Sequence, residues 1–207
     1  MRVDNIKWLV LLMCGLACIQ IAAAQVSVEK EAHHKIVLEN EWVRVLEGRV
    51  LPNDTTPAHI HSANSVVVFL SSTGLGIRVA GQEPTVTPVA PGDIRYVNYG
   101  DKPINHIVWA QGDSMLRFLV VELKQQKLDS CPLGARPDIK LRLAQKQVSV
   151  YDWNPASPQP ATASGAPPGI PAAACARMVI VPATGAFTFY PPNTPVQAQT
   201  RCLVLEF

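Results

Sequence analysis

Short apolar runs separated by turn residues are the feature of this sequence that most limits its fold. The 207 residues include 18 prolines and 12 glycines, which divide the chain into short segments rich in Val, Ile and Leu. No window of about 11 or more residues keeps the i, i+3, i+4, i+7 apolar spacing of an amphipathic helix. Runs of about four to eight such residues between turn signals are typical of strands. The sequence therefore predicts an all-β protein.

Many short strands at close spacing favour a sandwich or barrel. The paired sheets of a jelly roll limit the number of exposed strand edges. With 48% hydrophobic residues, the chain can bury one substantial core. The predicted strands are 25–31, 35–39, 41–51, 59–61, 65–71, 76–80, 85–89, 94–97, 106–110, 115–124, 140–143, 147–153, 176–181, 186–190, 195–198 and 201–207.

Residues 1–24 have the composition of a secretory signal peptide. A basic start and an apolar run over residues 8–21 are followed by Ala22-x-Ala24, which offers a cleavage site before Gln25. We expect a periplasmic or secreted protein. No later stretch approaches the roughly 20 apolar residues of a membrane span, so none is expected after signal removal. A lipoprotein signal ending at Cys18 is the alternative, and the residues before Cys18 fit it less well.

The charge of the chain gives no support for nucleic-acid binding. Its formal net charge is +2, and Lys and Arg form no cluster, whereas a nucleic-acid site needs grouped cations to neutralise phosphates. A small-molecule ligand or substrate is therefore the expected partner. The sequence does not fix the oligomeric state and is compatible with a homodimer.

Three cysteines remain once the predicted signal peptide is removed. In an oxidising compartment two of them are expected to pair. Cys175 and Cys202 are favoured, because both lie in apolar, strand-like segments of the C-terminal part. Cys131 is the alternative partner, and the sequence does not fix the pairing.

A His-x-His pair is the strongest chemical signal in the chain. His59 and His61 flank Ile60 in a predicted strand, so both imidazoles face the same side, with α-carbons about 6.5 Å apart. That spacing suits one divalent metal, and His106, in another apolar run, is the candidate third ligand. The alternative is a satisfied or solvent-facing pair that binds no metal.

His33 and His34 form a second histidine pair, at a predicted bend. Adjacent residues of a strand point to opposite faces, so these two are poor partners for a single metal. We expect both at the surface.

Two motifs resemble those of the cupin family over about residues 35–124. They are Pro57-x-His59-x-His61, and Pro91-Gly92-Asp93 followed by His106. The resemblance implies a jelly-roll barrel in which His59, His61 and His106 bind a metal. The family's first motif also carries a glutamate, and Ser65 stands at that position here, with no acidic residue nearby.

Three neutral imidazoles suit Fe(II), Mn(II), Ni(II), Cu(II) or Zn(II) and leave coordination positions open. In several cupin-like oxygenases three histidines replace the usual two histidines and one carboxylate. The resemblance therefore implies a non-haem iron dioxygenase that acts on a small chelating substrate. The alternative is a non-catalytic cupin that binds a small molecule or serves as a scaffold, without a functional metal site.

Several side chains flank the second motif and are candidate substrate contacts. Tyr96 and Trp109 offer aromatic surface, as does Tyr99, while Arg95 could pair with an anionic substrate. The alternative for the aromatic residues is core or rim packing. For Arg95 it is a solvated position on a strand face.

The chain is predicted to comprise a signal peptide (1–24), a cupin-like barrel (25–124) and a β-rich C-terminal part (125–207) with a Pro/Ala-rich loop at 154–174. The run 201–207 echoes 117–123, which suggests a degenerate cupin repeat. No histidine follows residue 125, so such a repeat would lack the usual metal site. A β-extension that covers an edge of the first barrel is the alternative.

Overall fold

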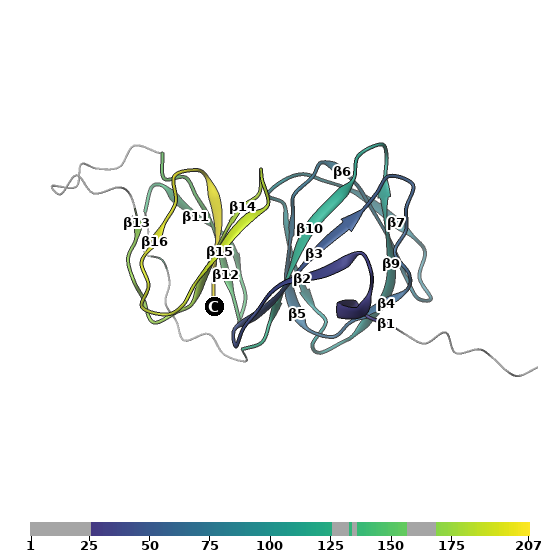
Figure 1. The fold of residues 1–207 in the computed structure, drawn as a ribbon, viewed down its shortest axis with the longest axis horizontal. Coiled ribbons are helices and arrows are strands. Elements are labelled where there is room, and N and C mark those ends of the chain that lie inside the picture. Colours follow the sequence, from purple (N-terminus) through teal and green to yellow (C-terminus); the bar gives the residue numbers. More distant parts are fainter. Residues whose placement is uncertain (1–25, 126–132, 134–135, 157–168) are drawn as a thin grey trace, which may run out of the picture.

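The computed structural model describes residues 26–125, 133, 136–156 and 169–207. The predicted signal peptide and Cys131 lie outside these residues. Regular structure in the described part consists of strands and one 3₁₀ turn, η1 (Val28–Lys30), which confirms the all-β prediction (Figure 1). None of the described segments forms a helix with the length and hydrophobicity that crossing a bilayer requires.

Residues 26–123 form two five-stranded sheets. In spatial order, sheet A contains β1 (Val26–Ser27), β4 (His59–His61), β9 (Ile104–Gln111), β6 (Thr73–Val79) and β7 (Thr85–Val89). Sheet B contains β2 (His34–Glu39), β3 (Val43–Val50), β10 (Leu116–Leu123), β5 (Asn64–Phe69) and β8 (Ile94–Asn98). From β3 onward the chain passes from one sheet to the other at nearly every turn, which is the connectivity of a jelly roll.

Alternation along the strands builds the core between sheets A and B. Leu46, Phe69 and Phe118 point inward from sheet B and meet Leu75 and Val108 of sheet A. The same alternation turns the intervening residues of sheet B to its outer face.

Gly48 has a specific role in this core. A Cβ atom there would lie 2.2 Å from the Phe118 ring. The glycine therefore lets this ring lie against β3, where its centroid is 5.5 Å from that of His34.

The first expected strand, 25–31, is wrong in its length. Only β1 is extended, and it pairs in parallel with β4 over two residues. The chain then turns through η1, where the Glu31 amide donates to the Val28 carbonyl at 3.2 Å. This turn brings Glu31 back beside the start of β2.

The C-terminal residues form two further sheets. In spatial order, sheet C contains β11 (Ile139–Ala144), β12 (Ser149–Trp153), β17 (Cys202–Glu206), β14 (Arg177–Val181) and β15 (Ala186–Tyr190). Sheet D pairs β13 (Gly169–Ile170) with β16 (Val196–Gln197). The short strand β13 lies within the expected loop 154–174, of which residues 157–168 are outside the described part.

Sheet C packs face to face on the outer side of sheet B, and Figure 1 shows the two units side by side. Val45, Val66 and Val121 of sheet B share one buried cluster with Met178 and Leu205 of sheet C. The C-terminal part therefore covers a face of the barrel, whereas the extension considered from the sequence would cover an edge.

The strand order of the C-terminal part repeats that of the barrel. Sheet C, in the order β11-β12-β17-β14-β15, matches sheet B, in the order β2-β3-β10-β5-β8, and the pair β13–β16 matches β4–β9. No described C-terminal strands correspond to the β6–β7 hairpin. This topology supports a reduced repeat, with β17 in the place of β10. Apolar side chains fill its interior, namely Tyr151, Trp153, Ile170, Val179, Val196 and Val204.

The predicted Cys175–Cys202 disulfide is wrong. Cys202 is a free, buried cysteine, and burial raises the pKa of its thiol to about 12, whereas Cys175 is disulfide-bonded. The register explains the error, because Ile180 of β14 lies opposite Leu203 and Arg177 lies opposite Glu206. Cys175, which precedes β14, is therefore at the opposite end of β17 from Cys202.

Candidate metal centre

Four buried histidines meet inside the N-terminal barrel. β4 turns His59 and His61 inward and Ile60 the other way, and its antiparallel pairing with β9 places His59 opposite His106. His34, the first residue of β2, faces them from sheet B. All four side chains are buried.

The three histidines proposed from the sequence converge. Their ring centroids are 5.1 Å apart for His59 and His61, 4.7 Å for His59 and His106, and 5.0 Å for His61 and His106. The Nε2 atoms of His59 and His106 are 3.1 Å apart. Two ligands at right angles, each about 2.1 Å from one metal, would be about 3.0 Å apart, so this separation fits a shared ion.

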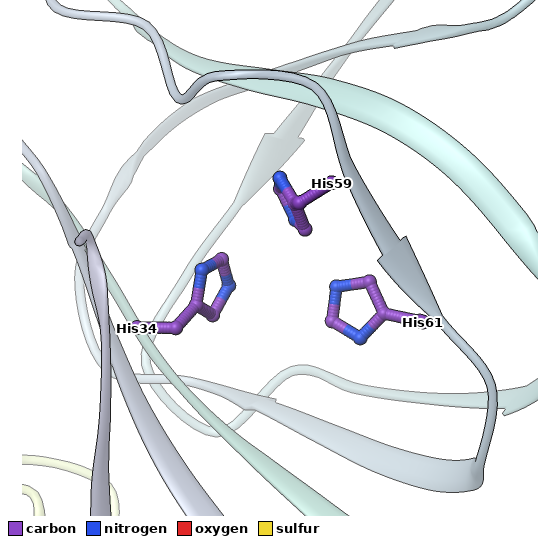
Figure 2. A group of neighbouring side chains, drawn as sticks. All are labelled: His34, His59 and His61. Carbon is purple, nitrogen blue, oxygen red and sulfur yellow. The ribbon is translucent and has the colours of Figure 1, made fainter. Parts of the chain in front are cut away.

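His34 is the residue that the sequence analysis misplaced at the surface. Its ring centroid lies 4.8 Å from that of His59 and 5.7 Å from that of His61. One ring nitrogen from each of these three residues lies within 4.8 Å of the others, and Figure 2 shows the rings around a common space. His34 faces inward because β2 begins at this residue, which pairs with Gly48 of β3.

Hydrogen bonds orient two of the four rings. The Nδ1 atom of His34 lies 2.6 Å from the Glu31 carboxylate, and that of His59 lies 2.9 Å from the Pro57 carbonyl. With Nδ1–H as the donor in each case, the lone pair lies on Nε2, and in His59 that atom is within hydrogen-bond distance of His106 Nε2. A ligand histidine held through its other nitrogen in this way is the usual arrangement at protein metal sites.

The Nδ1 atoms of His61 and His106 have no hydrogen-bond partner among the described residues, although both are buried. A buried polar atom without a partner costs about 1–3 kcal/mol.

The protein environment keeps three of the four rings, those of His59, His61 and His106, uncharged. Burial, reinforced by the neighbouring histidines, lowers the pKa of His61 to about 2 and that of His106 to about 3. Burial also lowers the pKa of His59. At neutral pH these rings are therefore neutral imidazoles, the form that binds transition metals.

Glu31 is the buried carboxylate beside the cluster. Burial opposes its ionisation, but hydrogen bonds from His34 and His33 outweigh that effect and lower its pKa to about 2. His33 contacts Glu31 through Nδ1 at 2.6 Å and Asp54 through Nε2 at 2.9 Å. Burial lowers the pKa of His33, but these two carboxylates more than compensate and raise it.

Ser65, which stands at the position of the motif glutamate, offers no replacement ligand. Its side chain is buried and donates to the Ala63 carbonyl at 2.9 Å. The fourth potential ligand of the cluster is therefore a histidine from a different strand.

A cavity of about 90 Å³ adjoins the histidines. Liquid water takes about 30 Å³ per molecule, so this space corresponds to roughly three waters. No aspartate or glutamate is among the described residues that line it, which are His34, His61, Val67, Phe69, Leu75, Ile77, Arg95, Val97, Tyr99, His106, Val108, Phe118 and Val120.

Of the three predicted substrate contacts, only Arg95 lines the cavity. Tyr96 follows it on β8, points to the other face and packs in the cluster between sheets B and C. Trp109 follows the inward Val108 and lies outside, against Gly76. Tyr96 and Trp109 therefore do not line this cavity. Tyr99 lines the cavity instead.

No family model matches the sequence, and no curated protein matches it significantly. Among solved structures, a cupin domain from Bordetella pertussis is similar at 22% identity, with a TM-score of 0.40, over 49% of this chain and 97% of that one. An RmlC-like cupin family protein from Methanocaldococcus jannaschii is similar at 16% identity, with a TM-score of 0.37, over 46% and 81%. The polyketide cyclase RemF from Streptomyces resistomycificus is similar at 20% identity, with a TM-score of 0.37, over 49% and 70%.

The topology of the barrel and the place of its motifs assign the fold. Ten strands form two facing sheets with jelly-roll crossings. The first histidine motif lies on β4 and the second on β9, and these strands pair so that His59 lies opposite His106. The N-terminal unit of this chain is therefore a two-sheeted jelly-roll barrel that carries its two histidine motifs on paired strands.

Proposed function

We propose that the barrel binds one divalent transition metal through His59, His61 and His106, with His34 as a fourth ligand. The observation that carries this proposal is the convergence of four buried rings, two of them with Nε2 atoms 3.1 Å apart. Nothing acidic lines the adjoining cavity among the described residues. A set of neutral nitrogens suits Fe, Mn, Ni, Cu or Zn, whereas Mg and Ca prefer oxygen ligands.

The surrounding side chains suit such a site. Val67, Phe69 and Val108 form an apolar wall, and the hydrogen bonds from His34 and His59 to Glu31 and Pro57 fix ring orientation. A bound metal would supply a Lewis acid or a redox centre. The chain itself would exclude water, hold the ligand rings and position a small molecule in the cavity.

We further propose that the barrel acts as a metal-dependent dioxygenase on a small chelating substrate. The four imidazoles would hold the metal, which would supply redox chemistry, and the adjoining cavity would admit a small molecule beside it. The alternative is a non-catalytic cupin that binds a metal or a small molecule.

Metal analysis of protein purified without a chelator tests the metal site. We expect one transition metal per chain, and its loss in the double variant His59→Ala/His61→Ala, which should keep the β-fold because the core aliphatic residues remain. His33→Ala is the matched control for loss of a histidine that is not a proposed ligand, because the ring nitrogens of His33 contact Glu31 and Asp54. A wild-type protein that binds metal no better than the double variant would contradict the proposal.

Oxygen uptake tests the catalytic part separately. The metal-loaded protein would be supplied with small chelating acids, diketones and thiols in an oxygen electrode. Uptake that depends on His59 and His61 supports the dioxygenase. A loaded protein that consumes no oxygen with any of these compounds leaves the binding-protein alternative.

A further inference from the structure

Two polar side chains line the cavity beside the histidines without a hydrogen-bond or ion-pair partner among the described residues. Seven of the nine arginines in the described part of the chain form ion pairs, and the exceptions are Arg78 and Arg95. Arg78 is exposed on β6, whereas Arg95 lines the cavity. The guanidinium carbon of Arg95 lies 5.3 Å from the centroid of the Phe69 ring.

Tyr99 also lines the cavity, and its ring contacts two of the histidines. Its ring centroid is 5.7 Å from that of His61 and 6.4 Å from that of His106. Its hydroxyl has no hydrogen-bond partner in the described part of the chain. A tyrosine hydroxyl carries its proton at neutral pH and can donate a hydrogen bond.

A partly buried cation without a counterion is costly, and its contact with an aromatic face compensates only in part. Because no carboxylate of the described residues lines this cavity, an anionic ligand is the natural counterion. The planar guanidinium fork matches a carboxylate through two parallel hydrogen bonds, and the Tyr99 hydroxyl adds a donor. The apolar walls favour a ligand with a short hydrocarbon body over a fully polar anion.

We propose that the cavity binds a small monocarboxylate, with its carboxylate held by Arg95 and Tyr99 and its other end directed toward the histidines. The volume of about 90 Å³ favours a small ligand of a few non-hydrogen atoms. The orientation toward the histidines rests on the proposed metal site. The carboxylate contact rests on Arg95 and Tyr99 alone.

Calorimetric titration of the metal-loaded protein with propionate and its neutral isostere propionamide tests the proposal. We expect propionate to bind about 10–100-fold more tightly, the usual effect of hydrogen bonds to a charged group. Arg95→Met should remove that preference, and Tyr99→Phe should weaken propionate binding several-fold. Arg78→Met is the matched control, because it removes an exposed arginine, and it should leave propionate binding unchanged. Circular dichroism would confirm that each variant is folded.

Equal affinity for propionate and propionamide would overturn the proposal, as would an unchanged propionate affinity in Arg95→Met. A third result against it is propionate binding that disappears in His59→Ala/His61→Ala but survives Arg95→Met, because the carboxylate would then be a metal ligand. Arg95-dependent binding that persists in the double variant supports the carboxylate site even if the metal proposal fails. Metal binding without any propionate binding overturns this inference and leaves the metal proposal intact.

Discussion

The Nδ1 atom of His34 lies 2.6 Å from the carboxylate of Glu31. Glu31 is buried and charged. It directly follows η1 and lies three residues before His34. This contact fixes the ring of His34 so that Nε2 is free toward His59 and His61. Glu31 thus holds a candidate ligand histidine in place without itself being a ligand.

Replacing this carboxylate should weaken metal binding. We expect Glu31→Gln to lower the affinity for Zn(II) or Co(II) about 10–100-fold, the usual effect of removing the group behind a ligand histidine. Competitive titration with a chromophoric chelator would measure it. Glu29→Gln, an exposed neighbour on η1, should leave the affinity unchanged. A lower melting temperature with unaltered metal affinity would assign Glu31 a purely structural role.

The adjacent histidines 33 and 34 provide a test of ligand number. We expect His34→Ala to weaken metal binding and to change the visible absorption spectrum of the Co(II) protein, because one nitrogen ligand is replaced by water. His33→Ala should keep the wild-type spectrum. If both variants retain it, the metal is held by His59, His61 and His106 without His34.

Acid should destabilise the metal-free protein in two overlapping ranges. His61 and His106 have pKa values of about 2 and 3, below the ordinary 6.5, so the unfolded chain takes up protons first and stability falls as pH drops below about 6.5. Glu31, at about 2 against 4.5, adds a loss as pH falls below about 4.5. Urea unfolding from pH 7 to pH 4 would measure the first range. His61→Gln should flatten it, and an unchanged slope would contradict the assignment.

Cys202 should be chemically inert in the folded protein. Burial raises the pKa of its thiol to about 12, so almost no thiolate is present at neutral pH. We expect alkylation by iodoacetamide only after unfolding, followed by peptide mass mapping. Rapid labelling of native protein at Cys202, or a Cys175–Cys202 peptide under non-reducing conditions, would contradict the structure.

Gly48→Ala should strain the wall of the site. The added Cβ would lie 2.2 Å from the Phe118 ring, and overpacking of this kind costs about 1–3 kcal/mol of folding stability. Because Phe118 contacts His34, metal affinity should also fall. Gly81→Ala is the control. It strains the backbone, because φ is +77° at this position, but its new Cβ would touch nothing, so it displaces no ring. Equal losses of metal affinity in both variants would exclude the specific role of Phe118.

The sequence predicted the features that follow from alternation within one strand. His59 and His61 share a face because their spacing is two, and their strands were recognisable from composition. The same rule would have excluded Trp109, since Val108 and His106 face inward, and it would have separated Tyr96 from Arg95. The predictions for Tyr96 and Trp109 considered the type of residue but not which face of the strand each residue occupies.

Other features depend on register and loop geometry that local sequence does not encode. His34 is inward because β2 starts at that residue after a turn through Glu31, and the bend could have placed either histidine inside. The cysteine prediction failed for a similar reason, since the register of β14 against β17 separates Cys175 from Cys202.

The packing of sheet C on sheet B has a consequence for assembly. Without the C-terminal part, the barrel would expose Val45, Val66 and Val121 to water, and a contiguous apolar patch of that kind marks an interaction site. Here sheet C covers that face. The chain thus buries against its own C-terminal sheet a surface that would otherwise be open to another protein.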